Sequence, residues 1–348
     1  MKHVIKRYLD NGVGYNDGRA TRVIEIESDS DYDELLAYIV ESDFYGKAYL
    51  PRQSGQVDAR LTGHFWWVAE MAALLKPRRV VELGCARGDV LRILAEQHRV
   101  DVVGIDFGSA LPERLWPVLR SSFRAGDILD VLRAWDQEPY DLGCAFDIWE
   151  HLHPRTLGET VDLLVKHSAD DALFLFVIPA FGADEVFGEP FPLELEENRR
   201  AFEAHEPFRF LLADAADNRV PAAGHLTWAH TDWWSRLFET RGLVREPDLE
   251  RKMHRLVDPH VPHSIRSFYV FRRDTPAAQR RAAAVHIPGP PAWTTLQSLM
   301  RRHAYQRRFH AGFDVLLRTE IERWSDSRGP VLRSVGKASR RLIQAVRP

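Results

Sequence analysis

Cysteine is almost absent from this sequence. The 348 residues include two cysteines, Cys85 and Cys144, and both lie in apolar runs that predict strands or strand ends. So few cysteines exclude a disulfide-stabilised scaffold, and their spacing does not indicate a zinc site. Long hydrophobic runs are lacking as well. The longest, residues 172–181, is about half the length that a membrane-spanning helix needs.

A secretory signal is also lacking. The first twelve residues include basic side chains, but no apolar stretch follows them. With no membrane span and no signal, we expect the protein to be cytoplasmic. The composition, 45% hydrophobic and 28% charged, is ordinary for a globular protein.

Excess charge is small over the whole chain but uneven along it. The net charge is -3, whereas residues 275–348 contain 14 Lys/Arg and 4 Asp/Glu, a net of +10, which leaves -13 for residues 1–274. A basic helical stretch at 331–346 has one apolar side. That pattern suits contact with an anionic membrane surface, with the acidic body or with a second subunit. Nucleic-acid binding is not favoured, because no known nucleic-acid-binding motif accompanies the basic residues.

Regular alternation of strand and helix patterns begins near residue 62. We predict helices at 62–75, 89–98, 111–120 and from Thr156, where Glu159 suggests a capping box, and another helix capped by Thr231. This alternation is typical of crossover units in a parallel sheet. The predicted strands are 78–84, 100–106, 122–126, 140–148, 172–178, 243–246 and 265–273.

These elements predict an α/β fold. We expect a doubly wound, Rossmann-like, mostly parallel sheet of seven strands with helices on both faces. Residues 1–60 form an N-terminal extension with one helix at 31–41, residues 61–273 the main domain, and residues 274–348 a basic helical tail. Residues 180–229 break the alternation as an irregular, aromatic insertion, which we expect to bind substrate.

Four strand ends carry residues suited to a nucleoside-like ligand, which such sheets bind at the carboxyl ends of their strands. Gly84 and Gly88 permit a tight turn before a helix N-terminus. Asp106 ends the second strand and can accept hydrogen bonds from two ribose hydroxyls. Asp127, beside the apolar Ile128, can accept a hydrogen bond from an exocyclic amine. The fourth strand end is the segment 146–151.

The segment Glu82–Gly88, an acidic residue followed by G-x-x-x-G, resembles the first motif of class I S-adenosylmethionine-dependent methyltransferases. Ala86 stands where that family usually has a third glycine. Segments 146–154 and 224–243 are similar to later segments of the family members that act on quinones, sugars and other small molecules. The resemblance covers about residues 60–273 and implies S-adenosylmethionine as cofactor. It assigns cofactor contacts to Glu82, Gly84, Cys85, Ala86, Gly88, Asp106, Phe107, Asp127, Ile128, Phe146 and Asp147.

A nicotinamide-binding Rossmann domain is the main alternative. It needs G-x-G-x-x-G and places a pyrophosphate at the helix N-terminus. Here the glycines are four residues apart, Arg87 lies between them, and Glu82 precedes the turn. A carboxylate suits the cationic amino-acid end of S-adenosylmethionine better than a pyrophosphate, so the methyltransferase interpretation is preferred.

Transfer to a hydroxyl is assisted by a general base, and histidine or a carboxylate can serve. His151 is the first candidate, and Glu150, His225 and His230 are the others. Each is also explained by a structural role, such as framing the cofactor or capping a helix. We expect no metal site, because Asp147, Glu150 and His151 lack carboxylates from other elements to complete one.

The acceptor is expected to be a small-molecule or glycan hydroxyl. A lipid-linked or quinone-type acceptor and a non-catalytic binding or scaffold role are the alternatives. Aromatic side chains outside the alternating core are candidates for acceptor binding, although each one alone is as well explained by packing. They are Phe44, Tyr45, Tyr49, Trp66, Trp67, Phe187, Phe191, Phe208, Phe210 and Trp228, together with Arg52.

Overall fold

A seven-stranded sheet forms the centre of the molecule. The computed structural model describes residues 5–9, 21–45, 59–107, 115–180, 195–214, 217–257 and 267–287. The strand order is β5-β4-β3-β6-β7-β10-β9, and only β10 runs antiparallel to its neighbours. This confirms the predicted doubly wound fold. The strands are β3 (Arg79–Leu83), β4 (Asp101–Asp106), β5 (Phe123–Ala125), β6 (Tyr140–Phe146), β7 (Ser168–Val177), β9 (Leu243–Arg245) and β10 (Phe268–Arg273).

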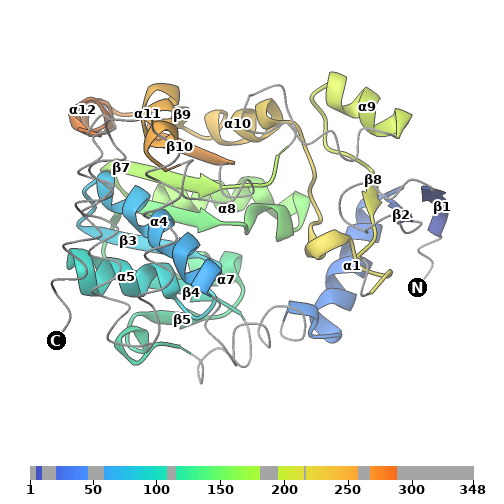
Figure 1. Cartoon of the computed structure of the whole chain (residues 1–348), viewed down its shortest axis with the longest axis horizontal. Coiled ribbons are helices and arrows are strands. Elements are labelled where there is room, and N and C mark those ends of the chain that lie inside the picture. Colours follow the sequence, from blue (N-terminus) through green and yellow to red (C-terminus); the bar gives the residue numbers. More distant parts are fainter. Residues whose placement is uncertain are drawn as a thin grey trace, which may run out of the picture.

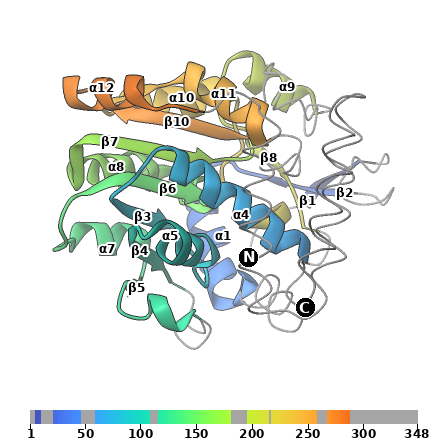
Figure 2. The same ribbon diagram turned by 60° about the vertical axis from the view of Figure 1, so that its left-hand side comes forward.

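Helices cover both faces of this sheet, as Figure 2 shows. The strands read as continuous apolar runs because successive side chains point to opposite faces and both faces are buried. In β3, Val80 packs in one core and Val81 in the other. The first core includes α4 (Ala59–Leu74), α5 (Asp89–His98), α11 (Pro247–Val257) and α12 (Pro276–Ala284). The second includes α7 (Ile128–Arg133), α8 (Pro154–Lys166) and α10 (Thr231–Glu239).

A smaller antiparallel sheet joins the N-terminal extension to the insertion. Its order is β1-β2-β8, with β1 (Ile5–Leu9), β2 (Thr21–Glu25) and β8 (Phe210–Leu212). Together with α1 (Asp29–Glu41) and α9 (Glu196–Glu203), these strands make a unit at one side of the main sheet (Figure 1). Its own apolar core includes Leu35, Ile39 and Phe208. The predicted helix 31–41 is therefore confirmed, whereas the insertion contains regular elements that its sequence pattern did not indicate.

Two predicted helix caps are wrong, and histidines replace them. His153 Nδ1 accepts the Arg155 N–H at 3.1 Å, so α8 begins before Thr156, and Glu159 pairs with Arg133 instead of closing a capping box. His230 Nδ1 likewise accepts the Asp232 N–H at 3.0 Å at the start of α10. A neutral imidazole nitrogen accepts hydrogen bonds as an Asp or Asn oxygen does, which explains why histidine can occupy both N-cap positions.

Further differences concern individual helices. Between β4 and β5 the described residues contain the short 3-10 helix η1 (Pro117–Leu119), and residues 111–114 of the predicted helix 111–120 lie outside the described part. The sequence pattern also did not reveal α7 and α11, and it did not give the bounds of α12 within the predicted helical tail. Since Ala282, Val285 and Ile287 belong to the first core, packing continues beyond residue 273. Among the described residues, no helix is both long enough and apolar enough to cross a bilayer.

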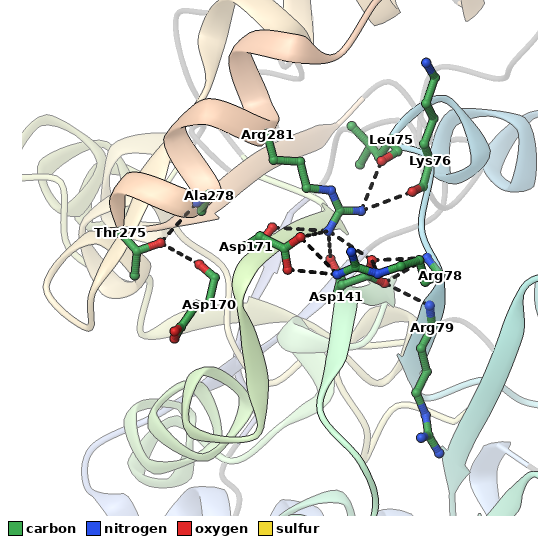
Figure 3. A network of polar contacts seen from close by, with 10 residues as sticks. All are labelled: Leu75, Lys76, Arg78, Arg79, Asp141, Asp170, Asp171, Thr275, Ala278 and Arg281. Atoms are coloured by element: carbon green, nitrogen blue, oxygen red, sulfur yellow. Dashed lines mark hydrogen bonds and ion pairs between the residues drawn. The ribbon is translucent and has the colours of Figure 1, made fainter.

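Arg281 anchors α12 at the amino ends of the central strands (Figure 3). Its Nη1 donates to the backbone oxygens of Asp141 and Asp171 at 2.8 and 3.1 Å, and Nη2 donates to Leu75 O at 3.1 Å. The Asp141 carboxylate, 3.2 Å from Nη1, also accepts the N–H groups of Arg78 and Arg79. This network lies at the edge opposite the carboxyl ends of β3 and β6 and has a structural role.

Candidate functional site

The turn after β3 has the left-handed backbone that its glycines permit. Gly84 has φ +67° and Gly88 has φ +80°. A Cβ at Gly84 would lie 2.3 Å from the Ile148 side chain, and one at Gly88 would lie 2.2 Å from Leu119 Cδ1. Ala86 also has a positive φ, +46°, at the position where the family usually has glycine. The turn is therefore tight, and the segment after β6 packs directly against it.

Asp106 is joined directly to this turn. The Ala86 N–H donates to Asp106 Oδ2 at 2.8 Å, so the carboxylate at the end of β4 reaches the end of β3. The Gly126 N–H donates to Asp106 O at 3.0 Å, which brings in the end of β5. Phe107 follows with 47% of its surface exposed. The ends of three neighbouring parallel strands thus converge, as strand order predicts.

Asp127 lies at the end of β5 and also caps α7. Its Oδ1 accepts the Leu129 N–H at 2.8 Å and the Asp130 N–H at 3.3 Å. The neighbouring Ile128 is 4% exposed and belongs to the second core. The capping role was missed, although an aspartate directly before an apolar helical stretch is a known signal for it.

Glu82 is a buried acid beneath the turn. It is 5% exposed, and its Oε2 has no hydrogen-bond partner among the described residues. Burial, followed by the nearby charges of Asp89 and Asp106, raises the pKa of Glu82 well above its usual value. A cationic group bound beside Glu82 would satisfy this oxygen and stabilise the ionised carboxylate.

The end of β6 lies beside the end of β3, at the point where the strand order reverses. Phe146 is half-buried there, and Asp147 has a left-handed backbone with φ +52°. Asp147 Oδ1 is buried without a hydrogen-bond partner among the described residues, and burial raises the Asp147 pKa to about 7. The reversal point of an open α/β sheet is where ligands of such folds bind.

Three of the four predicted catalytic residues cluster after β6. His151 Nε2 and His225 Nε2 each lie 3.7 Å from Glu150 Oε1, and the two imidazole rings are 4.7 Å apart in an edge-to-face arrangement. Glu150 O accepts the N–H groups of Leu226 and Thr227 at 2.7 and 3.0 Å. These backbone bonds bring His225, which is remote in sequence, against the β6 segment.

Burial shifts the pKa values of Glu150, His151 and His225 in the direction that favours the neutral form of each group. It lowers the pKa of His151 to about 4 and, with His151 beside it, lowers the pKa of His225. Burial, followed by the charge of Asp147, raises the pKa of Glu150. At neutral pH both imidazoles are therefore unprotonated and each retains a lone pair.

Tyr45, which follows α1, completes the cluster. Its hydroxyl lies 2.9 Å from His151 Nδ1 and donates to Gly224 O at 3.1 Å. Its ring also contacts that of Phe107, with centroids 6.3 Å apart. The sequence identified Tyr45 only as one of many aromatic residues, because nothing near it in the chain indicates contact with His151.

The contacts of His230 are with residues outside this cluster. Its Nδ1 caps α10, and its ring stacks on His205 with centroids 4.1 Å apart and the planes 7° from parallel. A structural role therefore explains His230.

Packing explains most of the predicted acceptor-binding aromatics. Trp66 and Trp67 are buried in the first core, and Phe44, Phe208 and Trp228 are buried in the core of the small unit, where Phe210 packs partly buried. Tyr49, Arg52, Phe187 and Phe191 lie outside the described residues.

Comparison with known proteins agrees with this geometry. Residues 64–246 match a family model described as a methyltransferase domain, which is more than half of the chain. The chain belongs to the methyltransferase-domain family. This membership confirms the resemblance to class I methyltransferases and, with it, S-adenosylmethionine as the cofactor. No curated protein matches the sequence.

Solved methyltransferase structures are also similar to the chain. An O-methyltransferase family protein from Burkholderia thailandensis is 13% identical, with a TM-score of 0.41, over 70% of this chain and 62% of that one. The mitomycin 7-O-methyltransferase MmcR is 12% identical, with a TM-score of 0.44, over 68% and 60%. A SAM-dependent methyltransferase from Archaeoglobus fulgidus is 14% identical, with a TM-score of 0.41, over 65% and 99%. The chain thus matches less than two thirds of the length of the first two proteins.

Proposed function

We propose that this chain transfers a methyl group from S-adenosylmethionine to a hydroxyl oxygen of a small molecule or glycan. The observation that carries this proposal is the placement of the Glu150–His151–His225 cluster next to the glycine turn of β3. The Ile148 side chain, two residues before Glu150, packs directly against Gly84. This neighbourhood supports an acceptor-activating role for the cluster beside a turn that would bind the cofactor.

The residues at the strand ends fit the cofactor. The proposed contacts are those assigned from the resemblance. The buried Glu82 carboxylate matches a cationic ammonium group, and a glycine turn without Cβ atoms permits close backbone approach. We expect Asp106 to receive the ribose hydroxyls, and Asp127 and Ile128 to border the adenine side. Phe107, Phe146 and Asp147 complete the same edge, with backbone groups of Cys85 and Ala86. The bound cofactor supplies an electrophilic methyl carbon on a sulfonium.

His151 is the proposed general base, and its surroundings select the nitrogen that acts. Gly224 O, 3.2 Å from His151 Nδ1, can only accept a hydrogen bond. Nδ1 therefore carries the proton, and Nε2 keeps the lone pair that can take a proton from a hydroxyl. Glu150 Oε1, 3.7 Å from Nε2, would stabilise the imidazolium that forms. A hydroxyl acceptor is favoured over a thiol or an amine because a base is of most use when the acceptor must lose a tightly held proton.

Two measurements test the proposal. Calorimetric titration with S-adenosylmethionine should show one site in the wild type and at least tenfold weaker binding in Asp106→Ala. Transfer of a tritiated methyl group to a panel of phenols, monosaccharides and nucleotide sugars should then reveal an acceptor class. Lack of cofactor binding by the folded wild type would support the scaffold alternative.

The base has its own control. His151→Ala should retain cofactor binding and lose about 100-fold or more in turnover, the usual contribution of general base catalysis. His98→Ala is the matched control, because His98 ends α5 at the opposite edge of the sheet and pairs with Glu70. Unchanged turnover in His151→Ala would remove the base assignment.

A further inference from the structure

Glu150 is a buried acid at the centre of the Glu150–His151–His225 cluster. Its side chain is completely buried, and neither carboxylate oxygen has a hydrogen-bond partner among the described residues. A buried carboxylate is normally paired, because removing it from water without compensation costs several kcal/mol. This arrangement therefore indicates a missing cationic or donating partner at this position.

The two imidazoles beside Glu150 do not hydrogen-bond to it, because both Nε2 atoms lie 3.7 Å from Oε1. His151 Nδ1 faces Gly224 O, so His151 Nε2 presents a lone pair toward Oε1. His225 Nε2 lies at the same 3.7 Å from Oε1. One possible ligand atom from each of the three residues lies within 4.8 Å of the others. Two imidazole nitrogens and a carboxylate that converge in this way can bind a cation, which would also stabilise the ionised carboxylate.

We propose that Glu150, His151 and His225 bind a divalent transition-metal ion. Two imidazole nitrogens and one carboxylate suit Zn²⁺, Co²⁺ or Ni²⁺, whereas Mg²⁺ and Ca²⁺ prefer sites built from oxygen ligands. Tetrahedral zinc with bonds of about 2.0–2.2 Å separates its ligand atoms by about 3.4 Å. The observed 3.7 Å between each Nε2 and Oε1 needs only a small inward adjustment.

The surroundings of the cluster support ligation. Metal-bound histidines usually donate their other N–H to a carbonyl or carboxylate, which fixes the ring. His151 Nδ1 has this environment, with Gly224 O at 3.2 Å and the Tyr45 hydroxyl at 2.9 Å. The backbone bonds from Leu226 and Thr227 to Glu150 O hold the segment that carries His225. The ligand set is therefore organised before an ion arrives.

Metal binding by this cluster does not depend on the proposed function. Only the effect of the bound metal on turnover rests on that function. His151 Nε2 cannot hold an ion and accept a proton at the same time. Zn²⁺ should therefore suppress methyl transfer that uses His151 as the base, and a chelator should restore it.

The test uses the full chain, stripped with a chelator, desalted and titrated with ZnCl₂ in a calorimeter. The expected result is one equivalent bound, with at least tenfold weaker binding in Glu150→Gln and in His225→Ala, as loss of a ligand predicts. Asp232→Asn is the matched control, because His205, His230 and Asp232 form the other histidine–carboxylate group of the described residues. It should bind as the wild type does.

A second measurement does not depend on the variants folding. Co²⁺ bound to the wild type should show a visible absorption band that Zn²⁺ displaces at one equivalent. Absence of that band and of Zn²⁺ binding in the stripped wild type would overturn the site, and so would unchanged binding in both ligand variants. Methyl transfer without metal binding would leave the proposed function intact, whereas metal binding without any methyl transfer would contradict only the function.

Discussion

Replacing Glu82 with glutamine should stabilise the folded, cofactor-free protein and weaken its binding of the cofactor. Glu82 is 5% exposed, and Oε2 lacks a hydrogen-bond partner among the described residues. An unsatisfied buried polar group costs about 1–3 kcal/mol, more when charged. Glutamine carries no charge, so Glu82→Gln should raise the free energy of unfolding of the cofactor-free protein by about 1–3 kcal/mol. In a domain of this size, each kcal/mol raises the melting temperature by about 2–4 °C.

The same change removes the proposed partner of the cofactor's ammonium group. A hydrogen bond to a charged group contributes about 1.5–3 kcal/mol. The dissociation constant for S-adenosylmethionine should therefore rise about 10- to 150-fold. Calorimetry measures the affinity, and thermal unfolding without cofactor measures the stability.

The stability gain should depend on pH in a defined direction. Burial raises the pKa of Glu82 above its usual 4.5, so the folded state holds this proton more tightly than the unfolded state. The contribution of Glu82 to stability is thus complete below pH 4.5 and is lost as pH rises toward the elevated pKa. Glu82→Gln should match the wild type near pH 4.5 and exceed it increasingly toward pH 8.

Glu138→Gln is the control for this experiment, because Glu138 is exposed. It should alter neither the melting temperature nor the affinity. A Glu82→Gln protein that is less stable than the wild type at pH 8, or that binds the cofactor equally well, would refute the reasoning.

Two further variants test the turn and the α12 anchor. Gly88→Ala combines a positive φ with a Cβ 2.2 Å from Leu119 Cδ1, so denaturant unfolding should show a loss of about 2 kcal/mol or more. Gly242→Ala has φ +79° but no atom within 4 Å of its Cβ, and should lose less; an equal loss would exclude the steric contribution. Arg281→Ala should cost about 1–3 kcal/mol, because the backbone oxygens of Asp141, Asp171 and Leu75 lose their guanidinium donor, while Arg78 still pairs with the Asp141 carboxylate. Its S-adenosylmethionine affinity should be unchanged, since the anchor lies at the opposite edge of the sheet, and a weakened affinity would show coupling between the two edges.

The local sequence pattern was sufficient to predict those elements whose apolar residues follow from which of their sides are buried. The apolar run of β3 and the 3.6-residue pattern of α5 both follow from which sides are buried, so the sequence alone predicted them. The meeting of Asp106 with the turn at Ala86 was also predictable. Parallel neighbouring strands end at the same edge, and that rule needs no coordinates.

Local signals were insufficient for two helix caps and for the packing of α12. The acceptor nitrogens of His153 and His230 cap α8 and α10, although serine, threonine and aspartate are the usual caps. At α12 a signal did exist: Thr275 caps the helix, and Pro276 occupies its first turn. The signal does not show that α12 packs on the main sheet, because the basic composition of residues 275–348 is typical of a separate tail.

The sequence by itself determined the sheet, the helices α4, α5, α8 and α10, and the carboxylates at the strand ends, because those depend on periodicity and on neighbouring strands. Only the tertiary structure decided that Tyr45, Glu150, His151 and His225 share one cluster. These residues come from three distant segments, and backbone bonds from Leu226 and Thr227 to Glu150, together with the Tyr45 hydroxyl, join them. Such contacts produce no periodic pattern in the sequence. Each one joins two polar groups that are far apart in the chain, and it becomes favourable only after the core has folded.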